Sequence, residues 1–309
     1  MFENWLIIAF VAPALWSIVN LIDVYFVSDV YRDEYDGALI SGIFPLILWG
    51  SVPLGIVTFR LPESFALLLL SGAFFLFANF FYFKSLFREN DAALIQILWS
   101  LTIPFTILFS FVFLGDGLFG SQYFGIVLIL FGVVQILLAE RTEKWDVRGA
   151  AKSMLPSSAF LAGSFVLSEQ AFRTSRDDFF SSYLVFALGM ALGAIFVGFL
   201  GQRSFSDRFS QVTRLTKKYF FVFFLAELLA LLGTIASQRA VDLSPSASLV
   251  ATIESLSPVF IMCFSLLAVV FSSLFLGKFK RALYKDQITG AVTKIMAVIT
   301  VAVGIYLVK

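Results

Sequence analysis

Long apolar stretches separated by short polar links recur along the whole chain. Each stretch has about 20 mostly apolar residues, the length that an α-helix needs to cross the hydrocarbon core of a bilayer. Polar clusters such as DVYRDEYDG and FREND end one stretch before the next begins. The pattern therefore predicts an all-α membrane protein with ten transmembrane helices. The predicted spans are residues 4–25, 38–58, 65–87, 91–114, 121–139, 153–172, 179–200, 218–238, 245–275 and 287–308.

The two halves of the chain carry similar patterns on either side of a polar link at residues 139–152. Pro104 and Pro258 lie well inside corresponding spans, and a Gln-x-x-Gly pattern opens the following span in both halves. We therefore expect two five-helix repeats, residues 1–143 and 144–309. Because five is an odd number, the second repeat would cross the membrane in the opposite sense, as in transporters whose site lies between inverted repeats.

Composition supports a membrane protein and excludes several kinds of chemistry. The chain is 60% hydrophobic and 14% charged, against about 45–50% and 25% in soluble domains. It has a single Cys and no His, so neither an intrachain disulfide nor a His-based metal site is expected. We predict no cofactor and no metal. The net charge of +1 gives no indication of a nucleic-acid partner. The first residues, MFENWLIIAF, lack the features of a cleaved signal peptide, so we expect the first span to be retained.

A proline inside a span, a Leu-Gly-acid motif and a Gln-x-x-Gly motif follow one another in the first half of the chain. The residues of this ordered set are Pro104, Leu114, Gly115, Asp116, Gln122, Gly125 and Gly132. The set resembles a pattern of the EamA-like family of the drug/metabolite transporter superfamily, which usually has Glu where Asp116 stands. Segments 14–23 and 162–172 also resemble the first helix of each repeat in that family. The resemblance implies ten helices in an inverted 5+5 repeat, export or exchange of a small metabolite, and no ATP-binding domain.

Two acids and one base lie deep inside predicted spans. A charge at the bilayer centre costs roughly 2.5–3.5 kcal/mol, so such residues usually face the interior of a bundle. Glu254, one turn before Pro258, and Glu227 are each expected to bind substrate or to exchange a coupling proton. The alternative for either acid is a structural ion pair. Lys294 either pairs with one of them or extends its amine to the membrane interface.

Further polar side chains lie on spans that the resemblance assigns to the cavity wall, namely spans one, three, four, six, eight and nine. Asp23 and Glu169 lie nearer the ends of their spans, so solvation by water is an alternative to cavity lining. Trp99 either stacks on a substrate or packs in the core. The complete set of candidate substrate or coupling residues is Glu254, Glu227, Asn20, Asp23, Asn79, Gln96, Trp99, Glu169, Gln170 and Lys294.

Small residues at helical spacing indicate close helix packing. Gly189 and Gly193 form a G-x-x-x-G pattern in the seventh span, and Gly125 and Gly132 share a face of the fifth. The commoner use of such faces is packing within one chain. Packing between chains is the alternative, so the sequence is compatible with a monomer or a homodimer.

The distribution of positive charge predicts an orientation, because Lys and Arg prefer cytoplasmic links. Sixteen of the 22 Lys and Arg residues follow odd-numbered spans, and five follow even-numbered spans or lie at the C-terminus. This bias places both termini outside the cytoplasm. Family members are commonly drawn with both termini inside, and the sequence leaves the two orientations open.

These patterns together favour a secondary transporter over an enzyme. We expect a multi-pass protein of the cell (inner) membrane that contacts lipid and carries a small metabolite by alternating access, coupled to protons or to exchange. The excess of acids favours an amino acid or amine. Alternatives are a nucleotide-sugar or lipid-linked substrate, an integral membrane enzyme resting on scattered carboxylates, and a purely structural membrane component.

Overall fold

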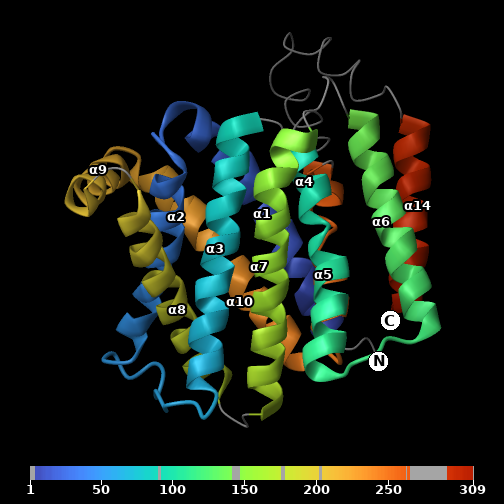
Figure 1. Ribbon diagram of the computed structural model, residues 1–309, viewed down its shortest axis with the longest axis horizontal. Coiled ribbons are helices and arrows are strands. Elements are labelled where there is room, and N and C mark those ends of the chain that lie inside the picture. Colours follow the sequence, from blue (N-terminus) through green and yellow to red (C-terminus); the bar gives the residue numbers. More distant parts are fainter. Residues whose placement is uncertain are drawn as a thin grey trace.

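A computed structural model describes residues 4–89, 92–140, 147–174, 178–201, 204–261, 263–264 and 291–308. All regular elements in these ranges are helices, and Figure 1 shows most of them side by side in one bundle. In chain order they are α1 (Asn4–Asp29), α2 (Glu34–Ile43), the 3₁₀-helix η1 (Phe44–Ser51), α3 (Phe65–Glu89), α4 (Ala92–Trp99), α5 (Thr102–Phe109), the π-helix η2 (Ser110–Leu114), α6 (Gly120–Glu140), α7 (Val147–Thr174), α8 (Phe179–Leu200), α9 (Phe205–Lys218), α10 (Phe220–Leu243), α11 (Ala247–Glu254) and α14 (Ala291–Val308).

Four of the described helices, α1, α3, α8 and α10, are long and apolar enough to cross a membrane. Shorter apolar helices accompany them, among them α6 and α14. Large apolar side chains such as Phe124, Phe131 and Phe199 are exposed on the outside of the bundle. An exposed apolar surface of this kind is typical of contact with lipid. The structure therefore describes an all-helical, multi-pass membrane protein.

The closest helix contacts are made at glycine residues. A Cβ added to Gly189 of α8 would lie 2.1 Å from the carbonyl oxygen of Leu69, and one added to Gly72 of α3 would lie 2.0 Å from that of Phe186. At Gly193 the same addition would lie 3.2 Å from the Leu76 side chain. Because no side chain fits, α3 and α8 touch backbone to backbone. The G-x-x-x-G pattern is used for packing within this chain.

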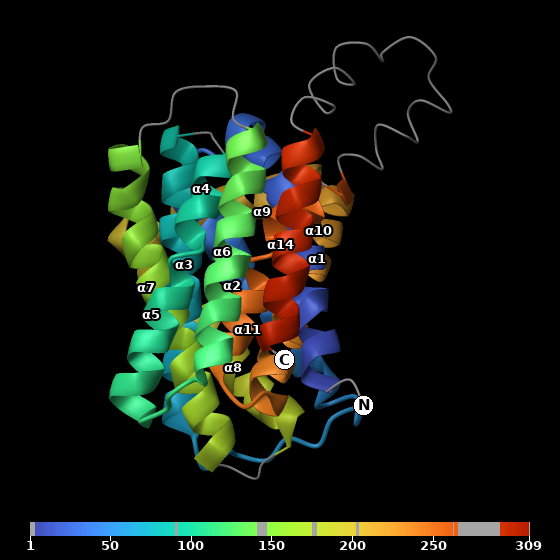
Figure 2. The same ribbon diagram turned by 90° about the vertical axis from the view of Figure 1, so that its right-hand side faces the viewer.

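A second glycine contact joins α6 and α14. A Cβ at Gly125 would lie 2.7 Å from the carbonyl oxygen of Gly304, and one at Gly132 would lie 2.8 Å from that of Ala297. These two helices run side by side at the edge of the bundle (Figures 1 and 2). The small face expected on the fifth span therefore packs against small residues of α14.

Two predicted spans that we expected to be continuous are interrupted. Stretch 91–114 is divided into α4 and α5, and α11 ends at Glu254 before helix resumes at residue 257. Pro104 and Pro258 have no N–H to donate to the carbonyls of Ser100 and Glu254, four residues earlier. Both interruptions lie just before these prolines. Residues 265–275 of the predicted ninth span are outside the described residues.

The stretch predicted as the second span also differs from a single α-helix. It consists of the short helix α2 followed by η1, whose first turn contains Pro45. The helix α9, which the sequence did not lead us to predict, follows α8 and has a strongly polar face. Its Arg208 is buried and forms an ion pair of 2.6 Å with Asp33, in the link between α1 and α2.

The start of α1 and the end of α14 lie at the same end of the bundle (Figures 1 and 2). The link between α1 and α2, the end of α3 and helix α9 lie toward the other end (Figure 1). We refer to these as the terminal end and the α9 end. Basic residues of the described part gather at the α9 end, among them Arg88, Arg214, Lys217 and Lys218.

Candidate functional site

A cavity lies inside the bundle, between helices that are far apart in the sequence. The space open to the centres of water molecules measures about 100 Å³. One water needs roughly 10–15 Å³ of such space, so the cavity has room for several waters or a small solute. Its wall is formed by Trp16, Val19, Asn20, Asp23, Ser41, Pro45, Phe75, Asn79, Tyr82, Phe83, Gln96, Trp99, Ser100, Thr102, Ile103, Leu161, Phe165, Met190, Glu227, Ala230, Leu231, Thr234, Ala251, Glu254, Ser255 and Ser257.

Three carboxyl groups face this cavity from three different helices. Asp23 of α1, Glu227 of α10 and Glu254 of α11 are 8%, 8% and 7% exposed. No Lys or Arg is among the described residues that form the wall. A buried carboxylate without a positive partner is costly, so it is stabilised by a proton or by a bound cation. The cavity therefore provides a site for positive charge.

Glu254 occupies the end of α11, where the helix is interrupted. Neither carboxylate oxygen has a hydrogen-bond partner of ordinary geometry among the described residues, although Ser237 of α10 lies nearby. Its main-chain carbonyl, which Pro258 leaves without the usual amide donor, accepts a hydrogen bond of 3.1 Å from the Ser257 hydroxyl. The interruption thus leaves the carboxyl group free to bind a ligand while the backbone is satisfied by a side chain.

The other two carboxyl groups form a second polar centre, nearer the α9 end. Asp23 and Glu227 are close enough to interact electrostatically across the contact of α1 with α10. The Tyr82 hydroxyl donates a hydrogen bond of 3.2 Å to Oδ1 of Asn20 and also lies close to Asp23. Two carboxylates held close together attract a cation more strongly than either would alone.

Aromatic side chains also form part of the cavity wall. Trp99 packs edge-on against Tyr82, with ring centroids 4.9 Å apart and an interplanar angle of 87°. The Trp16 ring nitrogen donates to the carbonyl oxygen of Ala230 at 3.4 Å, which fixes the indole against α10. Aromatic faces attract cations and also bury apolar groups. The wall therefore suits a ligand with both a positive and an apolar part.

The structure brings most of the sequence-predicted residues together at this cavity. Glu169 and Gln170 are not among the residues of the wall. The Glu169 side chain is instead buried in an ion pair of 2.6 Å with Arg173. Lys294 is in the first turns of α14, but its side chain is outside the part that the structure describes. The candidate residues that form the cavity wall are Asn20, Asp23, Asn79, Gln96, Trp99, Glu227 and Glu254.

Sequence reasoning missed several members of the wall. Tyr82 is one turn after Asn79 on α3, so extending the polar face of that helix by one turn would have found it. Ser41 gave no signal, because it belongs to the short helix α2 and its hydroxyl bonds to the carbonyl of Gly37. In the described residues, no group of three or more His, Cys, Asp or Glu is arranged to hold a metal ion.

Comparison with known proteins bears on the fold alone. No family model matches the chain, and no curated protein matches its sequence. A crystal structure of another protein superposes on it with a TM-score of 0.63 at 18% sequence identity. The match covers 100% of this chain and 99% of that one. The likeness shows that the two chains share a fold over their full length.

Proposed function

We propose that the protein is a secondary transporter of a small cationic or zwitterionic metabolite, such as an amine or an amino acid. The observation that carries the proposal is a cavity that three buried carboxyl groups face, with no Lys or Arg among the described residues of its wall. Ionisable groups inside a membrane bundle usually mark the path of a substrate or coupling ion. Glu254 is the residue we assign to coupling, by proton or by exchange.

The arrangement of the helices supports the resemblance to EamA-like transporters with ten spans in two inverted repeats. In that reading α1, α3 and α6 are spans one, three and five, and α7, α10 and α14 are their counterparts. The structure packs α1 against α10 and, correspondingly, α7 against α3. It also packs α4 against α7 and, correspondingly, α11 against α1. Two repeats related by a two-fold axis require such reciprocal contacts.

A nucleotide sugar fits the cavity less well than a cation. Phosphate recognition needs Arg, Lys or helix N-termini directed at the ligand. The described wall has carboxylates and the C-terminal end of α11 instead, and both favour positive charge. The proposal involves no chemical step, so the residues are assigned to binding and coupling in the cell membrane.

Thermal unfolding of the purified protein with candidate ligands tests the substrate class. A ligand at 100 times its Kd adds about 2.7 kcal/mol to the stability of the folded state. We expect Tm to rise with amines or amino acids and to stay constant with nucleotide sugars. Stabilisation by nucleotide sugars alone would refute the cationic substrate.

The substitution Glu254→Gln tests the coupling residue. In vesicles, we expect it to reduce transport of the stabilising ligand to near background and to remove the dependence of the residual rate on pH. The control is Asp29→Asn, which removes an exposed carboxylate from the last turn of α1. Unchanged transport and pH dependence in the Glu254→Gln protein would show that Glu254 is not the coupling residue.

A further inference from the structure

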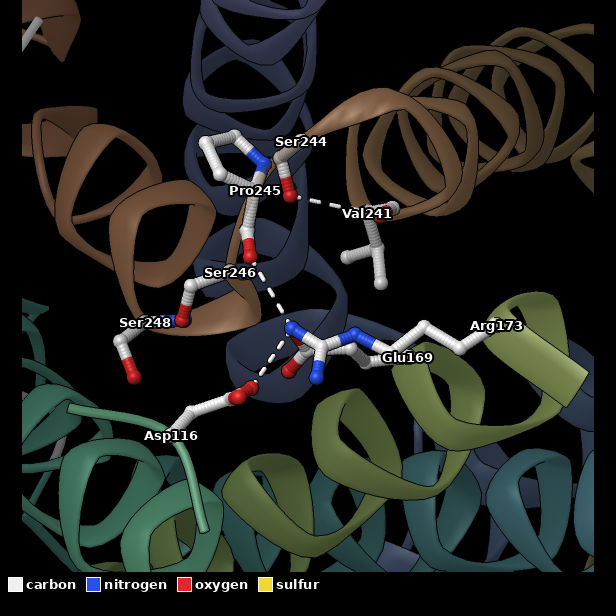
Figure 3. Close-up of polar contacts among 8 residues, drawn as sticks. All are labelled: Asp116, Glu169, Arg173, Val241, Ser244, Pro245, Ser246 and Ser248. Carbon is white, nitrogen blue, oxygen red and sulfur yellow. Dashed lines mark hydrogen bonds and ion pairs between the residues drawn. The ribbon is translucent and has the colours of Figure 1, made fainter. Parts of the chain in front are cut away.

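A cluster of charged residues at the terminal end joins three parts of the chain and lies apart from the cavity wall. Figure 3 shows Arg173, from the last turn of α7, reaching toward Asp116 and toward the carbonyl oxygen of Pro245. Its Nη2 atom is 2.6 Å from Oδ2 of Asp116, 2.6 Å from Oε1 of Glu169 and 3.0 Å from the Pro245 oxygen. One guanidinium thus connects α7, the link after η2 and the link before α11.

The cluster lies at the boundary between the packed interior and water. The Glu169 side chain is 2% exposed, whereas those of Arg173 and Asp116 are 39% and 26% exposed. Partly exposed ion pairs contribute little to stability, so the contact of Arg173 with Asp116 can break and re-form readily. Glu169 stays in place by itself, because it also faces the Ala247 amide at the positive end of the α11 dipole.

Helix α11 connects this cluster to the cavity. Its eight residues, Ala247–Glu254, are all buried, and they form a helix about 12 Å long that begins beside the cluster and ends at Glu254. Other acids and amides of the cavity, such as Asp23 and Gln96, lie toward the opposite end, where α1 ends and α4 begins. On the terminal side, therefore, a packed helix separates the cavity from water, and Arg173 holds the start of that helix.

We propose that Arg173, Asp116 and Glu169 form the gate that closes the terminal end of the transport path. The inference rests on the proposed transport function and concerns how the same cavity is opened. When Arg173 releases Asp116 and the Pro245 carbonyl, the start of α11 separates from α7 and water reaches Glu254 from the terminal end. The gate gives a role to Asp116, which belongs to the family-like pattern but has no place in the cavity wall.

A cysteine reporter tests whether the cluster closes this end. Cys263 is replaced by Ser, and Ala251, on the cavity-facing side of α11, is replaced by Cys. A membrane-impermeant maleimide is applied to sealed vesicles from the side on which an N-terminal tag is reached. We expect slow labelling in this background and labelling roughly threefold to tenfold faster after Arg173→Gln or Asp116→Asn. Arg173→Lys, which keeps the positive charge, should label close to the background rate.

The matched control is Arg239→Gln, at the same end of the molecule. Arg239 pairs with Asp242, three residues later in α10, so this ion pair lies within one helix. We expect this variant to label at the background rate. Asp116→Asn is the second variant in case Arg173→Gln does not fold, because it leaves the buried ion pair of Glu169 with Arg173 intact.

Two outcomes would overturn the gate. One is background labelling in folded Arg173→Gln and Asp116→Asn proteins, as judged by an unchanged thermal transition. The other is rapid labelling of the reporter from the terminal side before either substitution is made. The measurement requires no substrate. A labelling result that contradicts the gate therefore does not affect the ligand screen or the Glu254→Gln test. A ligand screen without a stabilising compound likewise does not affect the labelling result.

Discussion

At the residue scale, Ser17 illustrates how one hydroxyl supports the helix that is interrupted after Glu254. Its Oγ atom lies 2.9 Å from the carbonyl oxygen of Ser257 and 2.5 Å from that of Pro13 in its own helix. The hydroxyl is fully buried. Carbonyls inside a membrane bundle have no water to bind, so such side-chain donors take its place. Ser17 therefore holds the restart of the helix after Glu254 against α1.

We predict that Ser17→Ala lowers stability by about 1–3 kcal/mol, the cost of leaving a buried carbonyl without its donor. Thermal unfolding in detergent measures the change. Ser28→Ala is the control, because that hydroxyl bonds to the Val24 carbonyl on the exposed side of the same helix. Equal effects of the two substitutions would show that the contact with Ser257 contributes nothing.

The site residues that could be predicted from sequence are those that are anomalous in their surroundings. An acid or amide inside an apolar span, such as Glu254 or Asn20, is costly to expose to lipid and therefore faces the bundle interior. Glu169 looks equally anomalous, but Arg173 follows it at i+4, the spacing of an ion pair on one helix. Tyr82 could not be picked out by type, because the chain has 39 Phe and 9 Tyr that pack throughout the bundle.

At the element scale, the contact of α3 with α8 depends on two glycines, Gly72 and Gly189, each of which faces the backbone of the other helix. The pattern on α8 was visible in the sequence, whereas Gly72 on α3 stands alone there and became recognisable only through its partner. The interruptions were harder to predict. Pro13 and Pro156 lie inside the continuous helices α1 and α7, while Pro104 and Pro258 follow interruptions. Proline marks a weak point, and the neighbouring helices decide whether the helix divides there.

We predict that Gly72→Ala destabilises the protein by about 1–3 kcal/mol, because the new methyl group would overlap the Phe186 carbonyl and force α3 from α8. Gly117→Ala is the matched control, since a Cβ there meets nothing within 4 Å. The midpoint of thermal unfolding reports both. A Tm for Gly72→Ala equal to that of the control would contradict backbone contact between the two helices.

At the scale of the whole molecule, the fold separates charge between its two ends. In the part of the chain that the structure describes, the terminal end carries the start of α1, the end of α14 and few basic residues, whereas the α9 end carries Arg214, Lys217 and Lys218 on α9 and further bases around it. Hydropathy predicted the four helices that are long and apolar enough to cross a membrane. The distribution of charge gives an orientation that stays a prediction. The helix α9 was not predicted, because it is too polar to count as a span. The burial of its Arg208 could not be predicted either, because it depends on the ion pair with Asp33 in a distant link.

We predict that the terminal end faces away from the cytoplasm, since Lys and Arg are retained on the cytoplasmic side. A tag at either terminus should be cleaved by protease added to intact cells. A cysteine in place of Lys217, with Cys263 replaced by Ser, should react with an impermeant maleimide only after the cells are opened. The reverse pattern would establish the opposite orientation.

The interruption at residues 255–256 also determines what a movement of α11 would cost. In a continuous helix, tilting one arm would break main-chain hydrogen bonds at the bend, and each broken bond would be unsatisfied in a medium that offers no replacement. Here Pro258 has already removed one such bond, and the Ser257 hydroxyl donates to the Glu254 carbonyl in its place. Main-chain bonds from Ser255 to the Ala251 carbonyl and from Leu256 to the Ile253 carbonyl still cross the interruption. A swing of the arm therefore has fewer main-chain bonds to break than the same bend would have in a continuous helix.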